Sequence, residues 1–472
     1  MDTLDIKKQT EEIKKQYNTL LSKPELSGLR LLVGINMFLL IVLYVMPQYF
    51  GVHIGYDITS SRFANILLIV YALLQYKVFN LFIKTALRCS ITIPLMLYLF
   101  VTAYTMVFRI DINSFMLVFL ELLTLYMLVF AIRYVIGIKR AIKTIIGCSY
   151  FLAIYGFIEF AAGRSLYLQF LSTVPNNVVN CYRSGYYRIM GPCGHPLGYG
   201  LLLILLLALA CYDYEKEEIY LYKRPVLLVM LLGNVFLTGS RSSQGLALVE
   251  VFMILLMSKG TNKKKTIFYS LMILFALAAI LALTYKTKIG NYILMQITVL
   301  IDHVLGTEIA VNFGADMTTL ANSENYREYL PEIFKLDWLN PLLGRGAHSN
   351  FGVNVTGKNG ETIFIKSVDN YYIVQYIKYA YPGMFAYLAY IITGAVTMVR
   401  NLFKTKSELT KILLIGFCCY YINLWWVDAL QTLKFIYIYV AIFFAHLIWQ
   451  KDREKAENGI ITKYKAASLE ET

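Results

Sequence analysis

Charged side chains are scarce in this chain. Asp, Glu, Lys and Arg together make up 16% of its 472 residues, whereas hydrophobic residues make up 58%, and the mean hydropathy is +0.56. Soluble domains carry about 25% charged residues, so this composition excludes a water-soluble globular protein of this size. Lipid is the solvent that such a sequence requires for most of its length.

Motifs for metal binding are also missing. The sequence has no HExxH, no DxD and no paired CxxC. The acidic residues between its apolar runs lack the spacing of metal ligands. We therefore expect neither a metal nor another cofactor. Of the seven cysteines, five fall in or beside apolar segments, where cysteine behaves as a small apolar residue. For the other two, Cys181 and Cys193, the sequence does not decide between free thiols and a disulfide.

Apolar runs long enough to cross a bilayer recur along the chain. The first follows a polar tail of 28 residues, which is unlike a cleavable signal peptide. The predicted fold class is all-α, a polytopic integral membrane helical bundle with about twelve transmembrane helices and both termini on one side. The predicted spans are 29–47, 63–83, 89–107, 113–132, 144–162, 197–212, 225–238, 243–257, 266–284, 369–397, 408–427 and 430–449.

The net charge of +14 is distributed in a way that argues against nucleic-acid binding. Lys and Arg gather in alternate connectors between the apolar runs, among them 84–88, 133–143 and 400–411, and in both terminal tails. These connectors fall on one face of the predicted bundle. The positive-inside rule makes that face cytoplasmic.

Two segments on the opposite face, 163–196 and 285–368, are too long to be simple connectors. In the longer one, 291–304 has the pattern of an amphipathic helix, 323–337 of a second helix, and 357–360 of a turn between strand-like flanks. We expect this large extracytoplasmic loop to form a small cap. The predicted organisation begins with a cytoplasmic amphipathic N-terminal tail (1–28) and nine transmembrane helices (29–284). The large loop (285–368), three further transmembrane helices (369–449) and a cytoplasmic C-terminal tail (450–472) follow.

The spans 225–238 and 243–257 form a hairpin that is too short for the bilayer. About 14 residues of helix rise roughly 21 Å, less than the ~30 Å hydrocarbon core. The hairpin tip, which contains Gly239 and Arg241, should therefore lie low and be surrounded by protein or water. Gly239 and its small hydroxyl neighbours let a ligand approach the backbone, and the planar donors of Arg241 suit a phosphate or diphosphate.

Further arginines and two histidines lie in the outward-facing segments. They are Arg183, Arg188, Arg327 and Arg345, with His195 and His348. Any one arginine there is also explained by snorkelling to headgroups or by pairing with a carboxylate. His195 precedes Pro196, so a place at the start of a helix competes with a chemical role. His348 lies in a glycine-flanked loop, where it is a general base or a hydrogen-bonding residue of the loop.

Four motifs together resemble the O-antigen ligase and O-antigen polymerase superfamily. They are Arg188-x-x-Gly191-Pro192-x-Gly194-His195-Pro196, Leu237-Thr238-Gly239-Ser240-Arg241-Ser242-Ser243, Gly344-x-Gly346-x-His348-x-Asn350, and Asp369-Asn370-Tyr371-Tyr372 followed by Tyr381-Pro382-Gly383. Their order, spacing and placement match over roughly residues 140 to 400. The resemblance implies a multi-pass glycosyltransferase of the bacterial cytoplasmic membrane that takes glycans from undecaprenyl diphosphate, without metal, at its outer face.

The resemblance also implies roles for single residues. Arg241 and Arg327 would contact the diphosphate, Arg188 and Arg345 would assist them, and His348 would activate the acceptor hydroxyl as the catalytic base. The residues implied to support the site are His195, Gly239, Asn350 and Asp369.

The chemistry read from the residues agrees with these roles. Diphosphate is a good leaving group, so the site needs cations to stabilise it and a base to deprotonate a sugar hydroxyl. Attack opposite the departing diphosphate would invert the anomeric configuration. We therefore expect a polymerase of O-antigen, capsule or exopolysaccharide repeat units, within lipopolysaccharide or other cell-envelope synthesis.

The expected partners are lipid-linked glycan donor and acceptor and the bilayer, with a chain-length regulator and a flippase of the same pathway as further candidates. An O-antigen ligase shares the donor half of the site and is the first alternative. The second is a transporter of polysaccharide or lipid-linked sugar, although such proteins usually show internal repeats and binding groups at mid-membrane.

Overall fold

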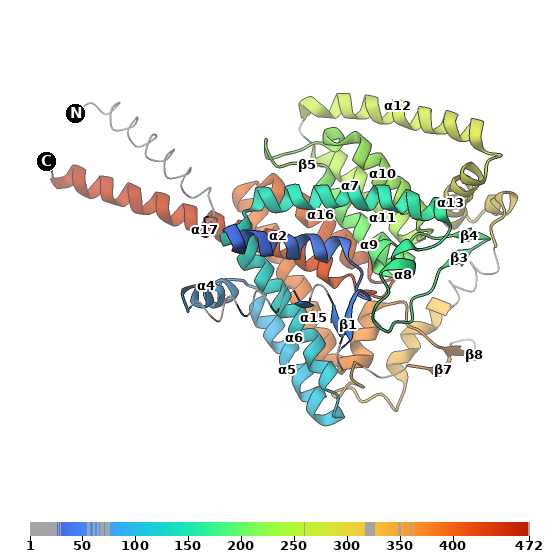
Figure 1. The fold of residues 1–472 in the computed structure, drawn as a ribbon, viewed down its shortest axis with the longest axis horizontal. Coiled ribbons are helices and arrows are strands. Elements are labelled where there is room, and N and C mark those ends of the chain that lie inside the picture. Colours follow the sequence, from blue (N-terminus) through green and yellow to red (C-terminus); the bar gives the residue numbers. More distant parts are fainter. Residues whose placement is uncertain are drawn as a thin grey trace.

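A computed structural model shows an almost entirely helical chain (Figure 1). It describes residues 30–53, 57–59, 76–258, 260–316, 326–347, 351–357 and 360–470, together with positions 26, 28, 62, 63, 66 and 70. Within these residues, strands occur as four antiparallel hairpins of two strands each. The predicted N-terminal tail, 1–28, falls almost wholly outside the described residues.

Most of the helices overlap predicted apolar runs, and most of 63–75, the first part of the second run, lies outside the described residues. The α-helices are α2 (Arg30–Val45), α4 (Tyr76–Leu87), α5 (Thr92–Arg109), α6 (Ile112–Phe130), α7 (Ile138–Ala162), α8 (Leu166–Phe170), α9 (Pro196–Ala210), α10 (Pro225–Leu237), α11 (Arg241–Met257), α12 (Gly260–Thr284), α13 (Lys288–Leu305), α15 (Tyr371–Thr405), α16 (Glu408–Asn423) and α17 (Leu433–Glu470). A π-helix, η1 (Ala131–Ile136), continues α6. The 3-10 helices are η2 (Gly191–Cys193), η3 (Leu221–Lys223), η4 (Ile309–Phe313) and η5 (Leu330–Lys335).

The hairpins lie in the links between helices. They pair β1 (Gly51–His53) with β2 (Asp57–Thr59), β3 (Tyr182–Arg183) with β4 (Tyr186–Tyr187), β5 (Tyr212–Asp213) with β6 (Glu218–Ile219), and β7 (Val353–Thr356) with β8 (Thr362–Ile365).

Six helices of the described chain are long and apolar enough to cross a membrane. They are Thr92–Arg109, Ile112–Ile136, Ile138–Ala162, Lys263–Thr284, Tyr371–Thr405 and Leu433–Asn458. Several of the other predicted spans are shorter helices, such as α9 with 15 residues and α10 with 13, and a helix of that size rises only about 20 Å. An all-α fold with membrane-spanning helices is thus supported, while the count of twelve spans stays a prediction.

The helix α9 forms the centre of the bundle. Its residues from Leu201 to Ala210 are at most 1% exposed, and it packs against α7, α10, α11 and α16. A helix that is apolar on all sides is stable where other helices surround it. The uniform Leu, Ile and Ala sequence of α9 is explained by this position.

The helix α12 is the opposite case. It lies along one side of the molecule (Figure 1), with Phe275 78% and Leu283 85% exposed. Soluble monomers rarely expose a continuous apolar surface of this kind. The surface of α12 is therefore suited to contact lipid.

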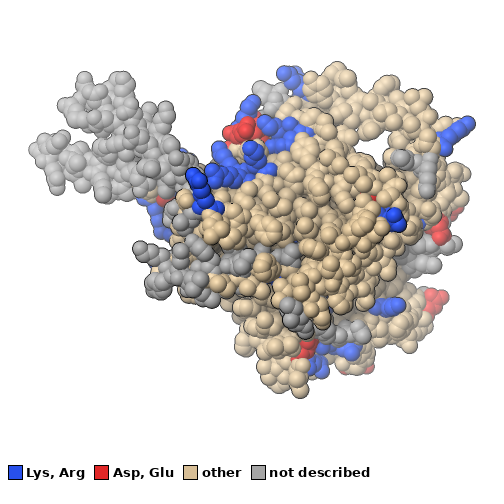
Figure 2. Space-filling model, in the orientation of Figure 1, with Lys and Arg blue, Asp and Glu red and all other residues tan. Residues whose placement is uncertain are grey.

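The basic connectors meet at one end of the bundle, which we call the basic end. Asp452 of α17 pairs with Arg88 and with Arg133, each at 2.9 Å, and Lys404 pairs with Glu454 at 2.9 Å. Figure 2 shows Lys and Arg side chains gathered toward the side from which α17 projects. The prediction that these connectors share a face is confirmed, and the side of the membrane that this face meets stays a prediction.

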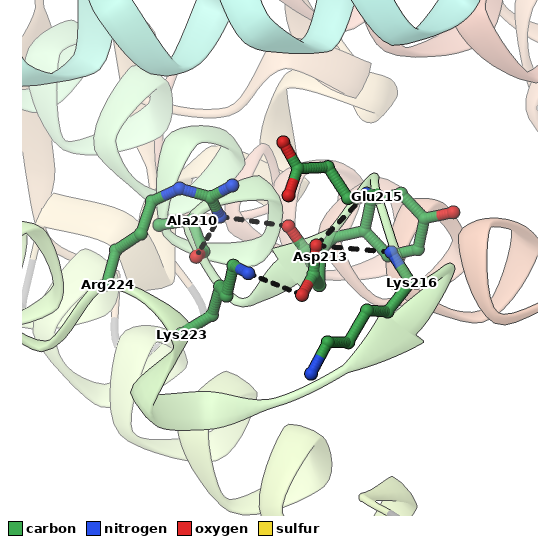
Figure 3. A network of polar contacts seen from close by, with 7 residues as sticks. Ala210, Asp213, Glu215, Lys216, Lys223 and Arg224 are labelled. Carbon is green, nitrogen blue, oxygen red and sulfur yellow. Dashed lines mark hydrogen bonds and ion pairs between the residues drawn. The ribbon is translucent and has the colours of Figure 1, made fainter.

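A network of polar contacts fixes the link between α9 and α10 at this end (Figure 3). Asp213 accepts a hydrogen bond from Lys223 and another from the Glu215 backbone N–H at 3.0 Å. The Arg224 guanidinium donates to the Ala210 carbonyl at 2.9 Å, so it caps a carbonyl at the end of α9. The link is therefore held by charged residues that lie at the level of the helix ends.

The long outer segment 285–368 differs in part from its prediction. The amphipathic helix 291–304 is present within α13, and 357–360 connects β7 to β8. The described part of the predicted helix 323–337 forms a single α-helical turn at 326–329 and then the 3-10 helix η5. Pro331, the second residue of η5, has no N–H for the α-helical pattern, which favours a short, tighter turn.

This segment has its own small hydrophobic cluster. Leu330, Ile333 and Val355 are buried with Ile373 and Ile377 of α15, so the segment packs on the first half of that helix. At the C-terminus, α17 continues to Glu470, so the described part of the predicted tail 450–472 is helical.

Candidate functional site

The tip of the hairpin between α10 and α11 is buried, as its short helices predict. Thr238 and Ser240 are 0% and 1% exposed. Gly239 has a φ of +60°, and a Cβ at this position would lie 3.1 Å from Arg188 Nε and 3.3 Å from Tyr292 Oη. Glycine is favoured here by the left-handed backbone and by the two covering side chains. These side chains, and not an open approach for a ligand, explain Gly239.

Arg241 occupies the first position of α11. Ser240 caps the helix, with its Oγ accepting from the Ser243 N–H at 3.4 Å, and Asn423 at the end of α16 donates to Ser243 Oγ at 3.0 Å. The half-buried Arg241 is thus placed at a helix N-terminus, whose dipole also favours anions. The tip provides two adjacent sources of positive potential.

Arg188 holds this tip in place. It is 6% exposed, and it donates from Nε to the Thr238 carbonyl at 2.7 Å and from Nη2 to the Gly239 carbonyl at 3.3 Å. Burial, followed by the charge of Arg183, lowers the pKa of Arg188 to about 10. Its described contacts are with the backbone that precedes Arg241, so the structure places it as a positioning residue.

Glu159, near the end of α7, anchors the segment that carries Arg188. Its fully buried carboxylate accepts from Tyr187 Oη at 2.7 Å, from the Gly191 N–H at 2.9 Å and from the Met190 N–H at 3.3 Å. In the sequence, Glu159 is only a carboxylate within an apolar run, where it needs a partner. The structure shows that it orders the whole turn 187–191.

Arg183 joins Arg241 and Arg327, although the sequence gave it no particular role. Burial, followed by the charges of Arg241 and Arg327, lowers the pKa of the Arg183 guanidinium below its ordinary value. The β3–β4 hairpin that carries Arg183 is attached to α13, since Asn291 Nδ2 donates to Tyr186 Oη at 3.2 Å. Three segments that are distant in the sequence therefore bring guanidinium groups together.

Arg327 and Asp369 lie beside the link that follows α16. Arg327 Nη2 donates to the Trp426 carbonyl at 3.4 Å, and Asn370 Nδ2 donates to the Trp425 carbonyl at 2.9 Å. Burial raises the pKa of the Asp369 carboxyl, and the charges of Arg327 and Arg183 oppose that rise. We call Arg183, Arg188, Arg241 and Arg327 the arginine cluster, with Asp369 as a carboxylate that interacts with it.

His195 is the N-cap of α9. Its Nδ1 accepts from the Leu197 N–H at 3.2 Å, so the interpretation of this residue as the start of a helix is confirmed. Burial, followed by the charges of Arg188 and Arg183, lowers the pKa of His195 to about 4. The imidazole is therefore neutral at neutral pH, as an accepting cap requires.

This pKa predicts an acid-sensitive contribution to stability. The unfolded chain binds a proton near pH 6.5 and the folded chain only near pH 4, so the contribution is complete above pH 6.5 and is lost as the pH falls through this window. We expect the melting temperature in detergent to fall between pH 7.5 and pH 4.5. His195→Asn keeps a capping oxygen, so the melting temperature of this variant should fall less steeply with pH. If the melting temperatures of the two proteins fell equally between pH 7.5 and pH 4.5, the assignment would be contradicted.

Arg345 lies in a loop that is fixed to a break in α15. Because Pro382 has no N–H, the Lys378 carbonyl has no partner within the helix, and it accepts from the Gly346 N–H at 3.0 Å. The Ile377 carbonyl accepts from the Arg345 N–H at 2.9 Å. The proline of the Tyr-Pro-Gly motif thus creates the attachment point of the glycine-rich loop.

The structure does not bring Arg345 into the arginine cluster. Its guanidinium lies 4.9 Å from the centre of the Trp338 ring, and no contact with the four clustered arginines occurs among the described residues. His348 and Asn350 lie outside the described residues. Ala347, just before them, donates from its N–H to Ser114 Oγ at 2.7 Å and to Asp111 Oδ2 at 3.1 Å.

Fold and site together define a mostly helical protein with helices fit to cross a membrane and an arginine cluster at the end opposite to the basic end. Neither the known protein-family models nor the curated proteins contain a match to the chain. All seven cysteines are free, including Cys181 and Cys193. Within the described ranges, no group of three or more His, Cys, Asp or Glu residues could hold a metal ion. The function is therefore argued from the chemistry of the cluster.

Proposed function

We propose that this chain is a polyprenyl-diphosphate-dependent glycosyltransferase that polymerises oligosaccharide repeat units at the outer face of the bacterial cytoplasmic membrane. The observation that carries the proposal is the arginine cluster, in which the charges of both Arg241 and Arg327 act on Arg183. Among the described residues, Asp369 is the one carboxylate in this cluster of four guanidinium groups, so the cluster as defined carries excess positive charge and favours an anion. A diphosphate supplies that anion and accepts the paired donors of several guanidinium groups.

The position of the cluster suits a lipid-linked substrate. Arg241 begins α11, at the end of helices that pass through the apolar core. A carrier lipid whose chains remain in the bilayer can present its diphosphate at this level. Fixed cations there stabilise the negative charge that develops on the departing diphosphate, and they need no rearrangement during the reaction.

The base of the proposed reaction is His348, a role that comes from the resemblance of its loop to the family motif. The acceptor hydroxyl gives its proton to the imidazole while its oxygen forms the new bond to C1 of the donor sugar. The bond from C1 to the diphosphate oxygen breaks, and the leaving group keeps the electron pair. Because attack and departure occur on opposite sides, the anomeric configuration inverts.

Reconstitution tests the function directly. Purified protein in nanodiscs, given a polyprenyl-diphosphate-linked repeat unit, should lengthen the lipid-linked glycan in the presence of EDTA. Activity that disappears on chelation and returns with Mn²⁺ would contradict the metal-free mechanism. Transfer only to an acceptor without the carrier lipid would indicate a ligase, and movement of the substrate across the membrane without elongation would indicate a transporter.

Arg183 provides a sharper test, because the sequence gave it no role and its interaction with Arg241 and Arg327 supports a place in the proposed site. Removing one guanidinium from a diphosphate site should raise the KM for the lipid-linked donor about tenfold, since a charge-assisted contact contributes about 1.5 kcal/mol. We expect this result for Arg183→Ala from initial rates over a range of donor concentrations. Arg164→Ala removes an exposed arginine just after α7 and should retain the wild-type KM. An unchanged KM for Arg183→Ala would remove that residue from the site.

A further inference from the structure

A second concentration of positive charge lines a cavity at the basic end of the bundle. The cavity has a volume of about 1010 Å³ and lies between η1, the first turn of α7, the link from α15 to α16, and α17. Its cationic lining residues are Arg133, Lys139, Arg140, Lys404, Lys406 and Arg453. Its anionic lining residues are Glu217, Glu408, Glu454 and Glu457.

Each of these four carboxylates already has a cationic partner. The pairs and their N–O distances are Glu217 with Lys139 at 3.6 Å, Glu454 with Lys404 at 2.9 Å, Glu457 with Arg453 at 3.0 Å, and Glu408 with Lys411 at 2.6 Å. The remaining cations of the lining are therefore in excess. Arg140 and Lys406 form no ion pair with any described residue, and Arg133 pairs with Asp452, which is not part of the lining.

Arg133 is the buried member of this group. Its side chain is 3% exposed, and Nη2 donates to Asp452 Oδ2 at 2.9 Å. Its Nε has no hydrogen-bond partner in the described part of the chain. Arg133 belongs to the π-helix η1, and π-turns inside helices occur frequently at functional sites. Asp452 accepts from Nη2 and leaves Nε unused, and a buried donor without an acceptor is costly.

We infer that this cavity binds a phosphate-bearing ligand through Arg133, Arg140 and Lys406. Ligand cavities in proteins have volumes of about 300 to 1,000 Å³, so the space accommodates a phosphate together with an attached organic group. Two unpaired cations and a buried guanidinium complement its negative charge. The headgroup of an anionic lipid and a soluble phosphate compound both present this chemistry.

The site is separate from the arginine cluster. The cavity includes Ile138 at the start of α7, whereas Glu159, which orders the turn carrying Arg188, lies near the end of the same helix. The helical rise between these two residues is roughly 30 Å. A ligand at the basic end is therefore not the glycan-transfer substrate in its reacting position, and the inference does not depend on the proposed function.

Two binding experiments distinguish the sources of the ligand. In the first, the full-length protein in neutral detergent is titrated with inorganic pyrophosphate in a calorimeter. In the second, the protein in phosphatidylcholine nanodiscs is compared with the protein in nanodiscs that also contain phosphatidylglycerol, by native mass spectrometry of retained lipid. Both are carried out on the wild type, Arg140→Ala, Lys406→Ala and Arg241→Ala. Lys143→Ala serves as the matched control, because Lys143 is exposed, lies one turn from Arg140 and does not line the cavity.

We expect saturable binding in at least one experiment, weakened about tenfold by Arg140→Ala or Lys406→Ala, as the loss of a charge-assisted contact predicts. Binding that survives Arg241→Ala but not Arg140→Ala assigns the ligand to the basic end, and the experiment in which it occurs identifies the source. An absence of saturable binding in both experiments overturns the inference. An equal loss in Lys143→Ala also overturns it, because only general surface charge would then be involved.

Discussion

Arg241→Ala is expected to lower the turnover of lipid-linked glycan by at least 100-fold, the size of effect produced when a group that stabilises developing negative charge is removed. The reason is its position: the side chain stands on the first residue of α11, on a buried tip that Arg188 and Asn423 hold in place. The measurement is single-turnover transfer with saturating donor, which separates chemistry from product release.

The controls for Arg241 separate charge from geometry. Arg241→Lys keeps the charge but not the planar pair of donors, so we expect an intermediate loss. Arg164→Ala should match the wild type, because Arg164 is an exposed residue outside the cluster. If Arg241→Ala kept full turnover while folding normally, the cluster would not be the site of transfer.

Glu159→Gln should lower the free energy of unfolding markedly. The carboxylate accepts three hydrogen bonds, from Tyr187, Met190 and Gly191, whereas an amide would direct N–H groups at some of these donors. Each buried donor left without an acceptor costs about 1–3 kcal/mol, so we expect a loss of about 2 kcal/mol or more in the free energy of unfolding. Denaturation in mixed micelles, followed by tryptophan fluorescence, measures it.

Glu250→Gln is the matched control for this substitution. Glu250 is also 0% exposed, but neither of its carboxylate oxygens has a hydrogen-bond partner in the described residues. The same change of carboxyl to amide should therefore leave stability nearly unchanged. If the two variants lost equal stability, burial of the carboxyl group rather than its three hydrogen bonds would be responsible.

Activity gives a second measure of Glu159. Because the turn 187–191 carries Arg188, and Arg188 bonds to the backbone just before Arg241, we expect Glu159→Gln to lower turnover even at temperatures where the variant is folded. Wild-type turnover in the folded variant would show that the tip keeps its geometry without this anchor.

The general character of the fold follows from the sequence. Low charge and repeated apolar runs require lipid, and the alternation of basic connectors predicts that Arg88, Arg133 and Lys404 share one end, as their ion pairs with α17 show. The short hairpin predicts a buried tip near Arg241. These features depend on local composition and length, which remain the same whichever helices become neighbours.

Tertiary structure alone decided which side chains meet. Arg183 and Arg327 are far apart in the sequence, and nothing local to either one indicates that their charges interact. The anchoring role of Glu159 and the separation of Arg345 from the cluster were likewise beyond sequence reasoning. Contacts of this kind depend on how whole helices pack, and a pattern of hydrophobicity defines the buried face of a helix but not the partner that covers it.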